Sequence, residues 1–432
     1  MSSTIIAVKG RQVWDSRGRP TVEAEVTLAS GASGRAIAPA GASRGAHEAI
    51  DLRDGGSAQG GFGVSRALAG IEDEIAGALN GVKSAQQAEI DHILCEVDGT
   101  HNKARLGANA IVAVSMAALH AAAADAREPL WKYLAQGRAV RTPLPEIQIF
   151  GGGAHAGRRT DVQDFMVMCP NAGSFRRALE ITEEVYRAAG ALMEEKGPIS
   201  GVADEGGWWP SFTSNEDALD TLTKAIDRSG HRAGEDVFIS LDIAGNELGD
   251  ASGYTLALDD RRLSGEEMAE RILDWSRKYP ILSIEDPAGQ DDWEVMSKVT
   301  ATIGDRVQII GDDVLVTDAE RVERAAAGKV CNAVLVKVNQ VGTVTQAKAA
   351  LDAAVGHSWG TIVSARSGES EDVTIAHLAT GWDAGQLKVG SFTRSERMAK
   401  WNEMLRIEEQ LGANAVFAGM SAFAGAIGKA PA

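Results

Sequence analysis

The stretch ILSIEDPAGQDDWEVMSKVTATIGDRVQIIGDDVLVTDAERVERAAAGKVCNAVLVK, residues 281–337, decides the fold of this chain. It contains three short apolar runs that end in charged residues, ILSIED (281–286), VQIIGDD (307–313) and AVLVK (333–337). Helical segments separate these runs. Apolar runs that alternate with helices are typical of buried parallel strands, so the stretch predicts repeated βα units.

The same pattern continues on both sides of this stretch. The run VFISLD (237–242) precedes it, and the runs TIVSAR (361–366) and QLKVG, which contains Lys388, follow it. Roughly 290 residues of such repeats favour a (β/α) barrel over an open, doubly wound sheet. No GxGxxG motif follows an early strand, which also speaks against a dinucleotide-binding fold.

The first third of the chain has a different pattern. The strand-like segments TIIAVKGRQVWDS and TVEAEVTLAS come first. Three segments with helical periodicity follow, namely HEAIDLRD, VSRALAGIEDEIAGALNGVKS and NAIVAVSMAALHAAAADA. Strands followed by helices suggest a separate α+β domain. We expect this domain over residues 1–138 and a C-terminal (β/α) barrel over residues 139–432, with a linker in GRAVRTPLP (137–145).

Composition excludes several classes of protein. Acidic residues outnumber basic ones by 60 to 43, giving a formal net charge of −17, and no basic stripe suits nucleic acid. Three scattered cysteines do not suggest a disulfide framework or a zinc site. No signal peptide and no run of about 18 apolar residues are evident, so we expect a cytoplasmic enzyme without membrane or nucleic-acid partners.

Charged residues end nearly every predicted barrel strand. In a parallel barrel these strand ends meet at one mouth, where catalytic residues are found. Three carboxylates together, without cysteine or histidine, are ligands that favour binding of Mg²⁺ or Mn²⁺. Separate salt bridges to lysines are the alternative, and the nearby residues Asp286, Asp313, Asp291 and Asp292 leave the ligand choice open. The charged strand ends are Asp242, Glu285, Asp312, Lys337, Arg366 and Lys388.

The two lysines of this set suggest enolisation. A lysine beside a metal ion and another cation has a lowered pKa and can act as a general base. A divalent metal stabilises the charge that develops when a proton next to a carboxylate is removed. Lys337 and Lys388 therefore suit such chemistry, although simple phosphate binding is an equal alternative for Lys388.

Long segments of the chain resemble enolase (phosphopyruvate hydratase). The resemblance implies an N-terminal α+β capping domain, a ββαα(βα)₆ barrel, Mg²⁺ dependence and a homodimer or larger homo-oligomer. The segments that carry it are WDSRGRPTVEAEV, GASRGAHEAIDLRDG, NKARLGANAIVAVSMA, GGGAHAG, VQDFMV, ADEGGWWP, SIEDP, GDDVLVT, VKVNQVGT, ARSGESED and RSERMAKWNEMLRIEEQLG.

The resemblance also implies roles for individual residues. It makes Lys337 the base that removes the C2 proton of 2-phosphoglycerate and Glu205 the acid that assists departure of the C3 hydroxyl. Lys388 would bind the substrate carboxylate, and Arg366 with Ser367 would hold the phosphate. The first Mg²⁺ would be held by Asp242, Glu285 and Asp312.

Further pocket residues follow from the same resemblance. Ser43, on the mobile loop GASRGAHE, would help to bind a second Mg²⁺ that arrives with the substrate. His155 and Gln163 would line the pocket, and Asp164 would be a partner on the acid side of the reaction.

Four positions depart from the family pattern. Ala365 stands where the family has a histidine, and Gly151 stands where it has an asparagine. Asp164 replaces a longer glutamate, and Arg44 changes the loop motif GASTG to GASRG. Arg158 and Arg159 follow the His155 loop. These changes predict a roomier and more cationic pocket for a larger anionic substrate. Simple surface ion pairs are the alternative for the arginines.

We therefore expect a specialised Mg²⁺-dependent, lyase-type member of this family that acts on a small phosphorylated substrate. The carboxyphosphonoenolpyruvate synthases of phosphinate natural-product biosynthesis, which join a phosphonoformate co-substrate to an enolpyruvyl unit, are the specific candidate. An ordinary phosphopyruvate hydratase is the alternative. A non-catalytic protein is disfavoured, since a scaffold has no reason to keep a costly cluster of charges.

Overall fold

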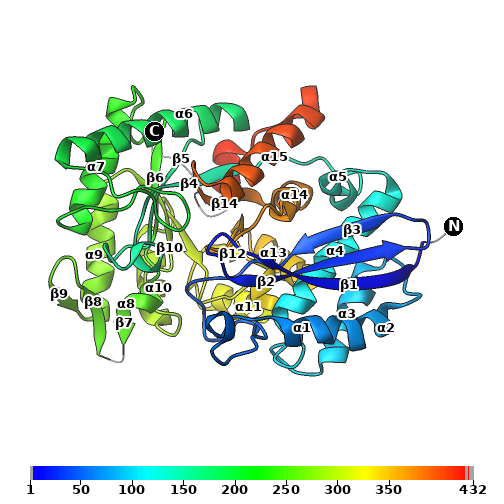
Figure 1. Ribbon diagram of the computed structural model, residues 1–432. Helices are drawn as coiled ribbons and strands as arrows, with labels where there is room; N and C mark the ends of the chain where they lie inside the picture. Colours follow the sequence, from blue (N-terminus) through cyan, green and yellow to red (C-terminus); the bar gives the residue numbers. More distant parts are fainter. Residues whose placement is uncertain (1–2, 251, 424–426, 428–432) are drawn as a thin grey trace.

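The computed structural model describes residues 3–250, 252–423 and 427. Figure 1 shows two parts, a three-stranded sheet with helices on its lower face (blue to cyan) and a barrel of strands surrounded by helices (green to red). The N-terminal part touches the barrel mouth, because Ala40 and Gly368 exchange backbone hydrogen bonds of 2.9 Å. The expectation of an α/β fold with a barrel is confirmed.

The N-terminal sheet is antiparallel, in the order β1-β2-β3, and packs on helix α4. Gly34 allows this close packing, since a Cβ there would lie 2.1 Å from the backbone nitrogen of Ala121. The elements are β1 (Ile5–Trp14), β2 (Pro20–Leu28), β3 (Ser33–Ile37), α1 (Ser65–Gly70), a π-helical turn (Ile71–Ile75), α2 (Ala76–Leu79), α3 (Gln87–Asp98), α4 (Ala108–Ala126) and α5 (Leu130–Ala135).

By length and composition, helix α4 could span a membrane, with a mean hydropathy of 1.3. However, 83% of this window is buried inside the protein, against strands β2 and β3. Its alanine-rich surface on all sides is explained by this burial, as expected for a core helix.

In the described part of the chain, eight strands close into a barrel in the order β10-β11-β12-β13-β14-β4-β5-β6. The pairs β4–β5 and β5–β6 are antiparallel, and the remaining pairs are parallel. Two strands and two helices therefore precede the βα repeats, as the ββαα(βα)₆ expectation requires. The strands are β4 (Leu144–Gly151), β5 (Asp164–Met168), β6 (Phe238–Asp242), β10 (Ile281–Glu285), β11 (Gln308–Gly311), β12 (Ala333–Val336), β13 (Gly360–Ser364) and β14 (Gly385–Ser391).

Helices surround the barrel, and several begin with a side-chain cap. Ser264 and Glu267 form a reciprocal capping box at the start of α9, which satisfies two of the free amides there. The larger helices are α6 (Phe175–Lys196), α7 (Asn215–Arg228), α9 (Gly265–Lys278), α10 (Trp293–Ile303), α11 (Ala319–Ala327), α13 (Val344–Gly356), α14 (Thr374–Gly381) and α15 (Ser395–Leu411). Short elements complete the loops: α8 (Gly245–Leu248), the hairpin strands β7 (Gly249–Asp250), β8 (Gly253–Leu256) and β9 (Arg261–Leu263), and α12 (Val338–Val341).

The segment HEAIDLRD (47–54) is not helical, contrary to expectation. Its backbone amides bond to other elements instead of to one another. Ala49 donates to the carbonyl of Gln340 (2.7 Å), and Ile50 donates to the carbonyl of Asn102 (2.8 Å). The apolar spacing that suggested a helix therefore reflects contacts with the rest of the protein.

Candidate active site

The carboxyl ends of the parallel strands bring charged side chains together at the barrel mouth. Lys388, on β14, is buried, and its Nζ lies 3.0 Å from Asp242 Oδ2 and 2.6 Å from Glu285 Oε2. Asp164 Oδ2 lies 3.8 Å away. Burial disfavours the charged ammonium, but these carboxylates outweigh burial and raise the pKa of Lys388 well above its usual value.

Lys337 follows strand β12 and pairs with the third of the expected metal ligands. Its Nζ lies 2.5 Å from Asp312 Oδ2, and Gln340 donates to the other oxygen of this carboxylate at 2.8 Å. Burial disfavours the ammonium, but Asp312 outweighs burial and raises the pKa of Lys337. A lowered pKa was expected beside a cation, whereas the immediate neighbour in this structure is a carboxylate.

The oxygens at the mouth fit a hard divalent cation. Among the described residues, Glu285 Oε1, Asp164 Oδ2 and Gln163 Oε1 are buried without a hydrogen-bond partner. Burial and the neighbouring carboxylate of Asp242 raise the pKa of Glu285 well above its usual value. An oxygen donor set with unpaired buried oxygens is the kind that Mg²⁺ prefers.

A second acidic group lies next to the expected ligands. Single carboxylate oxygens of Asp286, Asp312 and Asp313 lie within 4.8 Å of one another. Both oxygens of Asp286 already accept backbone amides, from Asp312 at 2.9 Å and from Asp313 at 2.7 Å. Asp286 therefore fixes the backbone at the end of strand β11. The side-chain carboxylates of Asp312 and Asp313 take no part in these two hydrogen bonds.

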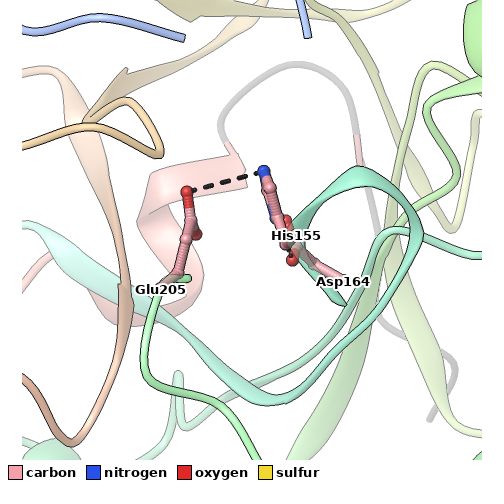
Figure 2. A group of neighbouring side chains, drawn as sticks. All are labelled: His155, Asp164 and Glu205. Carbon is pink, nitrogen blue, oxygen red and sulfur yellow. Dashed lines mark hydrogen bonds and ion pairs between the residues drawn. The ribbon is translucent and has the colours of Figure 1, made fainter. Parts of the chain in front are cut away.

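His155, Asp164 and Glu205 form a compact set on the other side of the mouth, shown in Figure 2. His155 Nδ1 lies 3.0 Å from Asp164 Oδ1, and its Nε2 lies 3.9 Å from Glu205 Oε1. Gln148 also donates to Asp164 Oδ1. The shorter side chain of Asp164 thus still reaches the histidine, which in turn faces Glu205.

The charges of this set hold the histidine in its protonated form. Burial disfavours the imidazolium, but Asp164 and Glu205 outweigh burial and raise the pKa of His155 to about 9. Burial also disfavours the Asp164 carboxylate, but His155 and Lys388 outweigh it and lower the pKa of Asp164 to about 2. At neutral pH the pair is therefore an imidazolium facing a carboxylate.

Arg366 is buried against the N-terminal domain. Its guanidinium pairs with both oxygens of Glu48, at 2.9 and 3.2 Å, and donates to the carbonyl of Ser43 at 3.0 Å. Burial disfavours its charge, but the pairing with Glu48 raises the pKa of Arg366 further above its usual value. Sequence reasoning missed Glu48, and the only signal for it was its place in the motif GASRGAHE.

Ser367 joins the same two parts of the molecule. Its hydroxyl accepts the backbone amide of Ala42 at 2.7 Å and the guanidinium of Arg17 at 3.2 Å. Arg17 also donates to the carbonyl of Ala40 at 2.8 Å. Arg17 lies in the quoted motif WDSRGRPTVEAEV, but no pattern within the sequence connected it to Ser367.

Loop 41–45 can approach the site because of its first glycine. A Cβ at Gly41 would lie 1.9 Å from an Arg366 guanidinium nitrogen, so any other residue would push the arginine away. Ser43 lines the cavity beneath this loop. The loop is therefore closed over the mouth in this structure.

The enclosed cavity is small, with a volume of about 20 Å³, or roughly one water molecule. A substrate can enter only when the loop or the paired side chains move. Its lining contains most of the expected site residues: Ser43, His155, Gln163, Asp164, Glu205, Asp242, Lys337, Ala365, Arg366, Ser367 and Lys388. Glu285 and Asp312 lie just behind it, as the ion-pair partners of Lys388 and Lys337.

The added arginines do not enter this cavity. Arg44 is exposed and donates to the carbonyl of Ala49 at 2.8 Å. Arg158 forms a surface ion pair with Glu247 at 2.6 Å, and Arg159 is exposed. Arg158 matches the alternative of a surface ion pair, whereas Arg44 lies 3.9 Å from the buried carboxylate of Glu48.

The glycine at position 151 also leaves no extra space. A Cβ there would lie 2.4 Å from the Cβ of Ala203, so a neighbouring side chain already fills this volume. Of the four departing positions, Ala365 and Asp164 line the cavity, whereas Arg44 and Gly151 do not.

Comparison with protein-family models covers nearly the whole chain. A model described as the enolase N-terminal domain matches residues 5–134. A second model, described as the enolase C-terminal TIM barrel domain, matches residues 139–426.

Proposed function

Because the chain belongs to the enolase family, we propose that it is a specialised Mg²⁺-dependent enzyme that forms an enolate from a substrate of the 2-phosphoglycerate or phosphoenolpyruvate type. Enolase-family enzymes are lyase-type enzymes that generally use Mg²⁺, act on small phosphorylated substrates and are often oligomers. The observation that carries the proposal is one cavity lined by Lys337, Glu205 and Ser367.

In this proposal Asp242, Glu285 and Asp312 hold the first Mg²⁺, and Ser43 contributes to a second that arrives with the substrate. Bound Mg²⁺ supplies positive charge that stabilises an enolate next to a carboxylate. The unpaired oxygen of Glu285 supports this assignment. Lys388, paired with Asp242 and Glu285, is placed to bind the substrate carboxylate.

Lys337 is the proposed base for the proton next to the carboxylate. Its ion pair with Asp312 favours the protonated lysine. If Asp312 bound a metal cation instead, the pKa of Lys337 would fall and the lysine could accept the proton. Arg366 and Ser367 are proposed to hold the phosphate. For Arg366 this requires the guanidinium to exchange part of its contact with Glu48 for the substrate.

Glu205 is the proposed acid for the departing hydroxyl, supported by His155 and Asp164. The imidazolium of His155 faces Glu205 across 3.9 Å and can stabilise its carboxylate after proton transfer. Ala365 lines the same cavity without a side-chain donor. Loss of one positioned donor or acid–base group costs about 10²–10⁴ in rate, so ordinary dehydration should be slow.

The specific reaction that we propose is that of the carboxyphosphonoenolpyruvate synthases, with a phosphonoformate unit as the second substrate. The replacement of the family histidine by Ala365, which lines the cavity together with Arg366 and Ser367, supports it. The ordinary phosphopyruvate hydratase reaction is the second candidate. It is favoured by the outward positions of Arg44 and Arg158 and by the filled volume at Gly151.

The absorbance assay for phosphoenolpyruvate formation from 2-phosphoglycerate with Mg²⁺ separates these two candidates. A kcat of about 10 s⁻¹ or more, typical of metabolic enzymes, would establish the ordinary hydratase and exclude the specialised one. A trace rate together with Mg²⁺ binding by calorimetry is expected for the specialised enzyme. Phosphonoformate and its nucleotide conjugate are then tested as co-substrates, and loss of all activity on Mg²⁺ removal is expected in either case.

A further inference from the structure

A second cavity, of about 310 Å³, lies at the other end of the loop that closes the active site. It is formed between residues 101–103 of the N-terminal domain and the helices α11, α12 and α13 of the barrel. Its volume falls within the range of small-molecule sites, whereas the active-site cavity holds about one water. The polar side chains that can bind a ligand in this cavity are those of His47, His101, Asn102, Lys103, Gln340 and Gln346.

Lys103 is the unusual member of this lining. The residue has a relative exposure of only 5%, and its backbone has a left-handed φ of 56°. The aliphatic stem lies against Gly342, whose added Cβ would be 3.3 Å from it. Among the described residues, no carboxylate lies within ion-pair distance of the Lys103 ammonium, and no hydrogen bond forms from it.

Lys103 lines the cavity, and its ammonium has no acceptor among the described side chains. An anion inside the cavity would supply one. The two lysines at the barrel mouth, Lys337 and Lys388, each have carboxylate partners instead.

The remaining walls restrict the ligand. Asp318 caps helix α11 by accepting the Arg321 amide at 2.8 Å, and the exposed Glu320 lies next to it. These two carboxylates disfavour a second negative group at the α11 wall. Neutral amides of Asn102 and Gln346 offer hydrogen bonds to hydroxyl or carbonyl groups. The cavity therefore suits a molecule with one anionic head.

The cavity also connects directly to the active site. The carbonyl of Gln340 accepts the Ala49 amide, and its side chain donates to Asp312. The carbonyl of Asn102 accepts the Ile50 amide. A ligand held against Gln340 and Asn102 would thus stabilise the end of the loop that carries Ser43 and Glu48.

We propose that this cavity is a binding site for a small organic anion, with a single carboxylate or phosphate head paired with Lys103, and that its occupation steadies the active-site loop. The site is separate from the proposed catalytic cavity. It does not depend on which reaction the enzyme catalyses.

Hydrogen exchange of the Ala49 and Ile50 amides tests the proposal in the full-length protein. Inorganic phosphate and acetate serve as probes for the two kinds of head. At about ten times the Kd of a probe, exchange of these amides should slow about tenfold in the native protein, because binding reduces the open population by that factor. Lys103→Met should abolish the slowing, since the uncharged side chain keeps the shape of the stem.

Two further variants complete the test. Lys224→Met makes the same change at an exposed lysine and should behave as the native protein does. Ala349→Phe fills the cavity from an exposed position on α13 and should also abolish the slowing, which decides the matter if Lys103→Met does not fold. Equal slowing in all variants would place the anion at the Arg366 side and overturn the proposal, as would no slowing by either probe.

Discussion

The two cavities at opposite ends of loop 41–49 differ in volume and in how their lysines are paired. The proposed catalytic cavity has about 20 Å³, and Lys337 and Lys388 are held by carboxylates. The other has about 310 Å³, and Lys103 has no such partner among the described residues. A network of opposite charges closes a site until a ligand or cation displaces a partner, whereas an unpaired ion leaves a site ready to receive a ligand.

The largest expected effect is at the paired lysine Lys337. Lys337→Ala should reduce exchange of the substrate α-proton with solvent deuterium by about 10⁴-fold, the upper end for a positioned base. Mg²⁺ affinity by calorimetry should stay nearly unchanged, because the carboxylates remain. Proton NMR in D₂O measures the exchange, with the exposed-site variant Lys224→Ala as control. Persistent exchange in Lys337→Ala would refute this lysine as the base.

The next effect tests the buried pairing that closes the catalytic cavity. Glu48→Gln leaves the buried Arg366 without its counter-ion and should lower the free energy of unfolding by about 3–5 kcal/mol. The matched change Glu247→Gln breaks the surface pair with Arg158 and should cost about 0–1 kcal/mol. Urea denaturation measures both. An equal loss of unfolding free energy in the two variants would show that the buried ion pair stabilises the protein no more than the surface pair does.

A pH dependence should follow from His155. Its pKa is raised in the folded protein to about 9, so its stabilising effect is fully present below its unfolded pKa near 6.5 and is lost as the pH rises through about 9. The contribution lost over this window is about 3 kcal/mol. Urea denaturation from pH 6 to pH 10 should show this loss in the native protein and a flatter profile in His155→Gln. Parallel profiles would contradict the raised pKa.

The smallest effect concerns the missing donor in the catalytic cavity. Ala365→His, alone or with Asp164→Glu, should raise residual formation of phosphoenolpyruvate by about 10²-fold, the low end for one positioned group. The absorbance assay measures it, with Ala301→His, at an exposed position on α10, as a control for an added histidine. No gain in either variant would mean that the active site has diverged beyond these two positions.

Much of the barrel could be predicted from sequence because its strands are short, apolar and end in charged residues. The runs around Asp242, Glu285 and Asp312 are strands β6, β10 and β11, and their charged ends do meet at the mouth. Strand polarity alone places such side chains on one side of a barrel. The local pattern therefore predicted the fold class and the convergence of these charged strand ends.

The pairing of these charges could not be predicted, because it depends on contacts between distant segments. Which oxygens Lys388 would reach, and that Glu48 would cover Arg366, required the packed structure. The same limit explains the segment 47–54, whose apolar spacing imitates a helix. Position within the chain says little about burial, so Arg44 and Arg158 were expected near the pocket although both are exposed.

The pairing of Glu48 with Arg366 also bears on how an active molecule is made. The two residues are 318 positions apart, so this ion pair cannot form during synthesis until almost the whole barrel has left the ribosome. Contacts at such separation form late, since the intervening chain must first be ordered. A chain that ends before Arg366 would therefore lack the ion pair that joins this loop to the barrel mouth.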